Sequence, residues 1–555
     1  MYKNVAIILF LIIFSFLIYS YGMGNIGLTD PDETFYAQTA KEMIERHNFS
    51  TPFIFGHPQF EKPILFYWLL IFSFKLFGIA EWARLWPALF GTLGVVVTFL
   101  MGKAMFTRKV GLYAALILAA SFLYLGSSRI VLTDIVLTVF ILLSMFFFYS
   151  GYTKSYKTNH YILSYIFAGL AVLTKGPIGL IIPISVIALF FVIQKQFGLL
   201  RRFIFCWQGW LLFLIVTLPW YGFVSLRFGK DFLYGFFIHE NIQRFFTAEH
   251  QSNNHWWFYP AVILLGMLPW SNLLPFMCVN PFKEFSNGAK VKSSLSQPKL
   301  FLHIWFWFVM LFFTFARSKL SSYILPLFPA LCLLFALQMA DIESNLNTNK
   351  KLNFAFLTSI LLTLVLLGGF IYSLFWIKEN FPALLLPSLS IEIILAIGIC
   401  ISPFLIFNKK VKAAIILNIV SVFIAIILTF NYLMPHLEGA FSDKMLLSQL
   451  PKNKPIKKEI LCSKIFVRGV HYYTNSPVAL ISSDKHPFYT PHSVDVLSAD
   501  SEIEGFFLSE KDIVCVVNES DLERINQITS SRRKNHIIYK NGERTVIISR
   551  PLHSE

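Results

Sequence analysis

The segment Val5–Gln38, "VAIILFLIIFSFLIYSYGMGNIGLTDPDETFYAQ", joins an uncharged apolar run to a group of three carboxylates. The run from Val5 to Tyr21 has roughly the 17 residues that a helix needs to cross a bilayer. No small-x-small cleavage site follows it, so we expect a retained first span and not a removed signal peptide. Asp30, Asp32 and Glu33 then stand directly beyond this span. The order predicts a charged group at a membrane boundary.

The rest of the composition has the same character. The chain has 555 residues, of which 56% are hydrophobic and 60 are phenylalanine, and its mean hydropathy is +0.61. These values lie outside the range of soluble domains and indicate a polytopic membrane protein. The formal charge of +16 comes from short basic clusters between apolar runs, which is typical of cytoplasmic loops. Nucleic-acid binding is therefore a poor interpretation.

Apolar stretches of roughly 17–25 residues predict about 13 membrane-spanning helices. They lie at 5–24, 83–102, 110–127, 131–150, 161–175, 177–194, 203–224, 256–279, 300–316, 322–340, 353–376, 384–407 and 413–434. The fold class is therefore a mostly α polytopic membrane protein. Ile64–Phe77 is apolar but only about 14 residues long, a length typical of an interfacial or re-entrant helix.

Charge decides the orientation. If Ile64–Phe77 lies along the surface, every basic cluster falls on the side of the N-terminus, which satisfies the positive-inside rule. We therefore expect a cytoplasmic N-terminus, with Gly24–Glu81 and the chain beyond Met434 on the outer side. In that first outer loop Tyr36, Ala40 and Met43 recur at helical spacing, which predicts an amphipathic helix on the membrane surface.

The last part of the chain differs in composition. Short β-rich runs and an Asn541–Gly542 turn, a strong hairpin signal, predict a small α/β domain outside the membrane. We accordingly expect a membrane domain at 1–434, which includes the first outer loop with its surface helices at 25–82, and an outer domain at 435–555. Of the six cysteines, only Cys462 and Cys515 lie in this polar region, where a disulfide is an open alternative.

Ionisable residues gather on the expected outer side. Carboxylates stand at Asp32, Glu33 and Asp134, while the cations are Lys62 and Arg244, with Lys175 and Lys319 as further candidates. Helix capping, headgroup contacts and helix-end anchoring are the structural alternatives. Charges at membrane depth are nevertheless functional candidates by default. Transfer of a sugar from a lipid phosphate needs both kinds, because cations stabilise the departing phosphate while carboxylates orient the acceptor or the sugar.

The motifs in this chain resemble those of the aminoarabinose transferases that modify lipid A. They are, in order, D-E-x-x-Y-A at 32–37, F-E-K-P-I at 60–64, L-T-D at 132–134, L-T-K-G at 173–176, H-E-x-I-Q-R-F at 239–245, a Trp-rich stretch at 256–270 and K-L-x-x-Y-I-L-P at 319–326. Each motif is weak alone, but their order along Gly27–Pro329 is specific. The family is a branch of the C-type glycosyltransferases, related to protein O-mannosyltransferases.

The resemblance implies a bacterial inner-membrane enzyme with a periplasmic active site. Its donor would be undecaprenyl phosphate carrying 4-amino-4-deoxy-L-arabinose, and its acceptor a lipid A phosphate. By motif, Asp32 and Asp134 would be catalytic or orienting carboxylates, while Lys62, Arg244 and Tyr323 would hold the carrier phosphate. Glu61 and His239 would form a candidate pair for a divalent metal, zinc or magnesium, and no organic cofactor is implied.

One departure keeps the substrate open. The family motif has arginine where this chain has Phe35, which removes a cation beside Asp32. A related transferase that uses another polyprenyl-linked sugar, such as galactosamine or mannose, on lipid A or another surface acceptor is the alternative within enzymes. A lipid or glycolipid transporter is the alternative from another class. It is disfavoured because the charges gather at one face and no matching halves recur.

Overall fold

The computed structural model describes residues 2–153, 158–247, 253–279, 296–344, 350–444, 459–485, 494–508 and 512–552. The chain forms two compact units. We call residues 1–21 with 85–433 the helical unit, and residues 22–84 with 434–555 the mixed unit. The first outer loop, which the sequence pattern assigns to the membrane domain, thus groups with the C-terminal segment.

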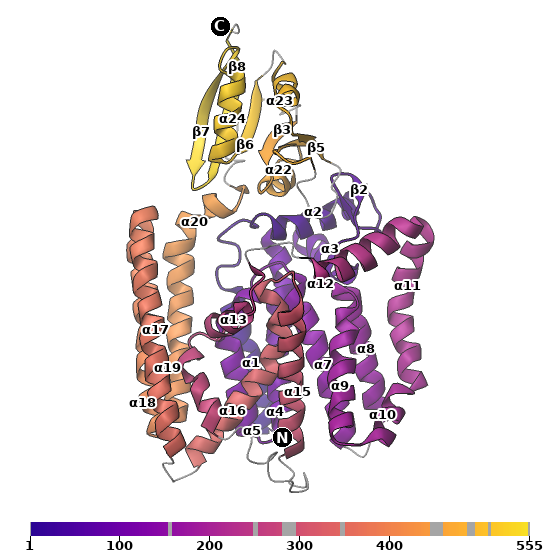
Figure 1. Cartoon of the computed structure of the whole chain (residues 1–555), viewed down its shortest axis with the longest axis vertical. Helices are drawn as coiled ribbons and strands as arrows, with labels where there is room; N and C mark the ends of the chain where they lie inside the picture. Colours follow the sequence, from indigo (N-terminus) through magenta and orange to yellow (C-terminus); the bar gives the residue numbers. More distant parts are fainter. Residues whose placement is uncertain are drawn as a thin grey trace. The chain divides into compact units, whose positions relative to one another are not determined.

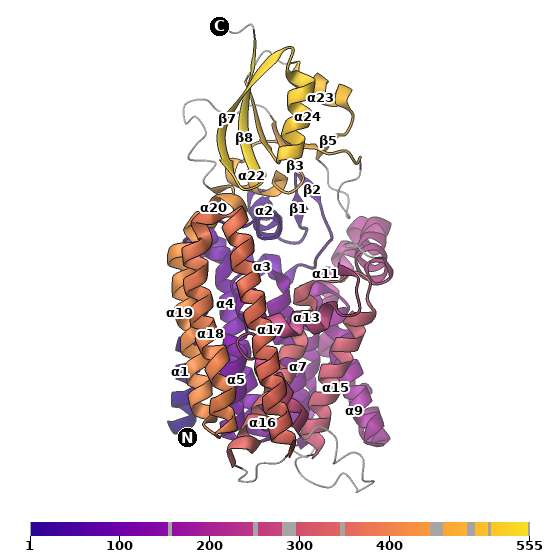
Figure 2. The same cartoon turned by 60° about the vertical axis from the view of Figure 1, so that its left-hand side comes forward.

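The helical unit is built from apolar helices, as the hydropathy pattern predicts. Its longer helices are α1 (Tyr2–Ser20), α4 (Leu85–Met105), α5 (Arg108–Ala120), α7 (Thr133–Thr153), α8 (Thr158–Lys175), α9 (Ile178–Ile193), α11 (Trp207–Phe232), α15 (Ser296–Phe315), α16 (Phe328–Ser344), α17 (Lys350–Asn380), α18 (Leu385–Phe407) and α19 (Val411–Leu428). Helices α7, α8, α9 and α11 run side by side (Figure 1), and α17, α18 and α19 form a second group (Figure 2).

Shorter elements join these helices. They are α6 (Phe122–Ser127), α10 (Phe197–Ile204), the π-helix η2 (Leu233–Gln243), α12 (Arg244–Phe246), α13 (Phe258–Gly266), η4 (Ser271–Val279), η5 (Ser321–Leu327), η6 (Pro382–Leu384) and the π-helix η7 (Thr429–Leu433).

Helices form at the predicted spans, but some of these helices are too short or too bent to cross a membrane as one continuous helix. Within the described residues, nine helices are long and apolar enough to cross a membrane, or ten if one bent pair counts as a span. That pair, Phe258–Gly266 with Ser271–Met277, bends by 108°, so the predicted span 256–279 is broken. The predicted spans 110–127, 161–175 and 177–194 coincide with helices outside the nine. The expected count of 13 is therefore not confirmed.

Charged side chains mark the two ends of the helical unit. At one end, Lys109 on α5 pairs with Glu343 on α16 at 2.7 Å, and the charge of Lys412 also acts on Glu343. At the opposite end of the unit, where α1 ends, Arg129 donates to the carbonyls of Ile18 and Tyr21. The C-terminus of a helix favours a cation at this place. Lys109 and Lys412 thus lie at one end of the helical unit and Arg129 at the other.

The mixed unit contains a helix-rich first part and a C-terminal sheet. The first part holds α2 (Asp32–Glu45), β1 (Phe53–Ile54), β2 (His57–Pro58), α3 (Leu65–Phe77) and η1 (Glu81–Arg84). The second part holds α20 (Met434–Phe441), β3 (Ile460–Ser463), α22 (Val467–Thr474), β4 (Val478–Ile481), β5 (Asp495–Leu497), α23 (Asp500–Phe507), β6 (Ile513–Val517), α24 (Glu519–Thr529), β7 (Arg533–Asn541) and β8 (Arg544–Pro551).

The predicted α/β fold and its hairpin are confirmed. The strand order is β5-β4-β3-β6-β8-β7, with β8 antiparallel to both of its neighbours. Gly542 makes the β7–β8 turn with a φ of 57°, a conformation that glycine adopts without a steric cost. Cys515 pairs in register with Leu461 and therefore faces the α23–α24 side, whereas Cys462 faces the α22 side. Both thiols are consequently free, because adjacent strand residues point to opposite faces.

Helix α2 differs from the expected amphipathic surface helix. Every residue from Glu33 to Met43 is buried, including Lys41 and Glu42. Lys41 donates to the carbonyl of Tyr472 at 2.9 Å and to Asn475, so α22 covers its polar face. The alternation of polar and apolar residues on α2 thus reflects contact with protein and not with lipid headgroups. Helix α3, with 13 residues, falls below spanning length, as the short apolar run at 64–77 predicts.

Candidate functional site

The three carboxylates at or just before the start of α2, Asp30, Asp32 and Glu33, have three different environments. Asp30 accepts two side-chain hydrogen bonds. Arg544, the first residue of β8, donates to its Oδ2 at 2.8 Å, and Thr34 on α2 donates to its Oδ1 at 2.8 Å. Arg544 also pairs with Asp443 at 2.9 Å, and all three side chains are at most 3% exposed. Burial raises the pKa of Asp30 well above 3.8, and the neighbouring Asp443 adds to the rise. Burial likewise raises the pKa of Asp443.

Glu33, predicted as a catalytic carboxylate, is enclosed by its partners. Arg84 donates to Oε1 at 2.8 Å and to Oε2 at 2.5 Å, and its other donors reach the carbonyls of Met23, Ile26 and Gly27. The hydroxyl and amide of Thr29 also donate to Glu33. Because Glu33 is 1% exposed and its oxygens are occupied, this geometry accounts for it as an anchor of the loop.

Asp32 is the exposed member of the three. It occupies the first turn of α2, where the helix dipole stabilises an ionised carboxylate. Three residues on, the ring of Phe35 carries the guanidinium of Arg468 at 4.7 Å from its centroid. A cation from α22 thus stands over the position at which the family motif has arginine.

The second motif of the first loop lies in the same unit. Lys62 is half-buried, and its Nζ donates to the carbonyl of Glu61 at 3.1 Å. The amide of Glu61 is held by the Oε1 of Gln59 at 2.9 Å, and Gln59 in turn donates to the hydroxyl of Tyr67 at 2.8 Å. The charges of Glu61 and Arg468 both act on Tyr67, so this motif and α22 share one electrostatic neighbourhood.

In the helical unit three motifs meet at one point. Asp134 begins α7 and Lys175 ends α8, and their side chains form an ion pair at 2.5 Å. The same ammonium lies 4.5 Å from the ring centroid of Tyr323 on η5. Gly176, with a φ of 92°, turns the chain beside Phe236 and Asn241 of η2. Asp134, Lys175 and Tyr323 are separate candidates in the sequence, and the structure brings them together.

The remaining predicted cations of this unit have protein partners. Arg244 pairs with Glu240 at 2.6 Å, and His239 lies 3.6 Å from the same carboxylate. Lys319 is buried and donates to Asn254 at 2.9 Å and to the carbonyl of Ala316 at 2.5 Å. The amide of Arg317 donates to the carbonyl of Phe245 at 2.9 Å, which joins the loop of Lys319 to that of Arg244.

A metal site is not apparent from the side chains that are described. Across those residues, no group of three or more His, Cys, Asp or Glu side chains could hold an ion. Glu61 belongs to the mixed unit and His239 to the helical unit, so the candidate metal pair remains a prediction. His239 lies beside Glu240 instead.

The sequence pattern did not reveal the partners of the predicted site residues. These partners decide which of the charged groups are buried in ion pairs and which are accessible. Arg84, Asp443 and Arg544 were not singled out, although each contacts one of the buried carboxylates or arginines described above. Arg468 was missed as well. Their only signal is that they are charged residues in apolar or β-rich surroundings, and their partners are up to 514 positions away.

The arrangement supplies charge-assisted donors and exposed or partly exposed carboxylates. Ammonium and guanidinium groups bind phosphate oxygens through short, strong hydrogen bonds. Lys175 pairs with Asp134 through an ammonium group, which carries three N–H donors and no acceptor. Each unit therefore contributes chemistry suited to a phosphorylated lipid.

Comparison with known proteins gives three findings. Residues 5–230 match the family model described as dolichyl-phosphate-mannose-protein mannosyltransferase. An uncharacterized protein of Aquifex aeolicus is 30% identical over 373 residues, which cover 67% of this chain and 71% of that protein. Undecaprenyl phosphate-alpha-4-amino-4-deoxy-L-arabinose arabinosyl transferase 2 of Proteus mirabilis is 31% identical over 332 residues, 59% of this chain but only 58% of its own length.

A solved structure has a similar fold. The crystal structure of ArnT from Cupriavidus metallidurans bound to undecaprenyl phosphate superimposes with a TM-score of 0.77 and covers 97% of each chain. The sequence identity is 19%, so the likeness is one of fold. It extends over both the helical unit and the mixed unit.

Proposed function

Because the chain belongs to the family of membrane glycosyltransferases that includes the protein mannosyltransferases and the aminoarabinose transferases, we propose that it transfers a sugar from undecaprenyl phosphate. The sugar that the resemblance supports best is 4-amino-4-deoxy-L-arabinose, and the acceptor is a phosphate of lipid A. The relatives named for this sugar share less than two thirds of their length with this chain, so substrate and acceptor are part of the proposal.

The observation that carries the proposal is the junction of Asp134, Lys175 and Tyr323. These residues come from three motifs that are separated in sequence, and an ion pair of 2.5 Å and a cation–π contact of 4.5 Å join them. A lysine at a helix end beside an aromatic ring suits the head group of a carrier lipid. Such a cluster at one end of a helical membrane unit supports a reaction at the lipid–water boundary.

The reaction breaks the bond between the anomeric carbon of the sugar and the phosphate oxygen of the carrier. The electron pair goes to that oxygen, and undecaprenyl phosphate leaves with an added negative charge. Lys62, Arg244 and Lys175 would stabilise this charge, with Tyr323 as a hydroxyl donor. An oxygen of the acceptor phosphate forms the new bond, and because it is already ionised it needs no strong base. Asp32 and Asp134 then serve to orient the reactants.

We place the reaction on the periplasmic face of a bacterial inner membrane. The basic residues Lys109 and Lys412 at one end of the helical unit support a cytoplasmic location for that end. The Asp134–Lys175 junction lies toward the opposite end, at the start of α7 and the end of α8. A divalent cation, zinc or magnesium, bound near Glu61 or His239 remains part of the proposal.

A second donor class is favoured by one residue. Phe35 stands at the motif position of arginine, and the guanidinium of Arg468 lies over it from another helix. The guanidinium of Arg468 would therefore approach the donor sugar from a different direction than an arginine at position 35 would. A polyprenyl-linked hexosamine or hexose is therefore the second candidate.

Mass spectrometry of lipid A from cells with and without the gene tests the proposal. A pentosamine increment that depends on the gene would support aminoarabinose, whereas a hexosamine or hexose increment would support the second donor. Purified protein in detergent should consume the polyprenyl-phosphate sugar without an ion gradient. Lipid movement without donor cleavage would instead indicate a transporter and overturn the proposal.

A further inference from the structure

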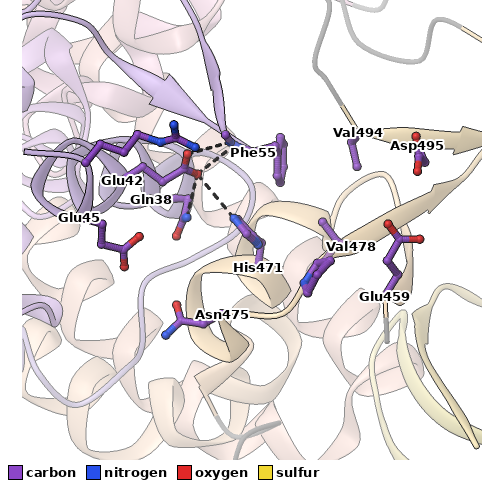
Figure 3. A pocket seen from close by; sticks show the side chains of 13 residues that line it. Gln38, Glu42, Glu45, Phe55, Glu459, His471, Asn475, Val478, Val494 and Asp495 are labelled. Atoms are coloured by element: carbon purple, nitrogen blue, oxygen red, sulfur yellow. Dashed lines mark hydrogen bonds and ion pairs between the residues drawn. The ribbon is translucent and has the colours of Figure 1, made fainter. Parts of the chain in front are cut away.

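A cavity of about 580 Å³ lies within the mixed unit. Helix α2 and the β1–β2 turn form one side of it, and α22 with strands β4 and β5 form the other (Figure 3). Its volume falls within the roughly 300–1,000 Å³ of small-molecule sites. All of its lining residues belong to segments 22–84 and 434–555, so it is separate from the Asp134–Lys175 junction in the helical unit.

One wall of the cavity is rigid because Glu42 is saturated with donors. The amides of Phe55 and Gly56 each donate to its carboxylate at 2.9 Å, and the Nε2 of Gln38 donates at 2.9 Å. The Nε2 of His471 lies 3.5 Å from the same group. Although burial alone would raise the pKa of Glu42, the hydrogen bonds from His471, Gln38 and Gly56 lower it below 4.5. Glu42 is therefore an ionised part of the wall.

The amide of Gln38 presents an acceptor without a donor. Its nitrogen is fixed by Glu42, while its Oε1 is buried and receives no hydrogen bond from the described residues. The residue is 2% exposed and lines the cavity. Buried amide oxygens are nearly always satisfied, so this one indicates a ligand that donates hydrogen bonds.

The charge of the lining selects the ligand further. The lining includes four carboxylates, those of Glu42, Glu45, Glu459 and Asp495, and one guanidinium, that of Arg46. The excess of negative charge favours a cation. The volume of about 580 Å³ accommodates a cation of the size of a small organic molecule.

An aromatic surface completes the lining. The rings of Phe55 and His471 are 5.2 Å apart and tilted by 44°, and both line the cavity. The C–H face of a sugar ring packs on such a surface, while its hydroxyls donate to carboxylate and amide oxygens. Carboxylates, an open amide acceptor and aromatic rings together describe a site for a hydroxylated amine.

We propose that this cavity binds an amino sugar as its cation, with the ammonium group toward Glu459 and Asp495 and the hydroxyls toward Gln38. The site is additional to the transfer reaction, and it recognises the sugar by charge and shape without breaking a bond. It depends on the mixed unit alone and not on the residues proposed to hold the carrier phosphate.

Titration of the full-length protein in detergent with D-glucosamine tests this inference. In slightly acidic buffer, which keeps the amine protonated, we expect saturable binding by calorimetry. D-Glucose and N-acetyl-D-glucosamine, which lack the charge, should bind at least 10-fold more weakly. The double variant Glu459→Gln/Asp495→Asn should weaken glucosamine binding by at least 10-fold, because it removes two of the charges.

Matched variants distinguish recognition inside the cavity from attraction to surface charge in general. Glu523→Gln removes an exposed carboxylate of α24 outside the cavity and should leave glucosamine binding unchanged. Lys62→Ala, which should lower transfer by roughly 10²–10³-fold, should retain glucosamine binding, so the two proposals can fail independently. Equal binding of glucose, an undiminished affinity in the double variant with an unchanged thermal transition, or displacement of glucosamine by millimolar magnesium would each overturn the inference.

Discussion

Two sets of ion pairs, one at the start of α2 in the mixed unit and one at the motifs of the helical unit, differ in how completely protein encloses them. In the mixed unit, Glu33 with Arg84 and Asp30 with Arg544 have side chains that are at most 5% exposed. In the helical unit, Lys175 and Asp134 are 14% and 8% exposed, and Arg244 is 18% exposed. The first pairs are sealed within the fold, whereas the second retain access to their surroundings.

The number of occupied donors explains what this difference means. Arg84 uses five hydrogen bonds, two to Glu33 and three to backbone carbonyls, which is the full capacity of a guanidinium. Such a group cannot accept a substrate without losing its structural role. Lys175 contacts a carboxylate and an aromatic face, and its side chain keeps 14% of its surface exposed. Sealed pairs therefore build the unit, and accessible pairs can do chemistry.

Arg84→Met should give the largest effect, because it leaves Glu33 buried without a counter-charge and three carbonyls without donors. Removal of one partner of a buried pair costs about 3–5 kcal/mol. We expect little folded protein in the membrane, measured by abundance and by thermal unfolding in detergent. Normal abundance and stability would show that the sealed pair is not structural.

Asp32→Asn and Lys62→Ala should each lower transfer by roughly 10²–10³-fold while the protein stays folded. Asp32 is exposed and Lys62 is half-buried, so neither substitution removes a fully buried charge. Lys75→Ala is the matched control, since Lys75 is exposed on α3 over the ring of Phe49. Lipid A mass spectrometry and donor consumption measure the change, and full activity in both site variants would remove the proposed role of this loop.

Lys175→Met should reduce transfer by roughly 10²-fold, because the phosphate loses one of its cations. Lys109→Met, which breaks a similar pair at the other end of the helical unit, should change activity little. If Lys175→Met lowers abundance, the double variant Asp134→Asn/Lys175→Met should restore the protein without restoring transfer. Recovery of transfer in the double variant would show that the Asp134–Lys175 pair has only a structural role.

Asp443→Asn should have the smallest effect, about 1 kcal/mol, and the size of the effect should depend on pH. Burial raises the pKa values of Asp30 and Asp443, so the folded state holds protons that the unfolded chain releases above about pH 4. Their contribution to stability is therefore lost as pH rises. An asparagine retains an acceptor for Arg544 and a donor for Asp30. We expect it to raise the melting temperature at pH 8 and to change it little at pH 5. The opposite order would show that Asp30 and Asp443 do not retain protons in the folded state.

The sequence predicted features that depend on local pattern. Long apolar runs indicate membrane helices because a span must satisfy its backbone internally, and the Asn541–Gly542 turn predicted a hairpin that forms with Gly542 at positive φ. The pattern could not distinguish a continuous span from the bent pair at Phe258–Met277. It also described α2 as a surface helix, because periodicity shows that one face is polar but not what covers it.

Sequence alone therefore determined the membrane class, the α/β C-terminal segment and the motif residues from which the family follows. Only the tertiary structure separated Asp30, Asp32 and Glu33, which are neighbours in the chain. Two of them meet arginines at positions 544 and 84, while Asp32 stays exposed. The physical reason is that the role of a charged group depends on its burial and its partners, and those partners come from distant segments that only folding brings together.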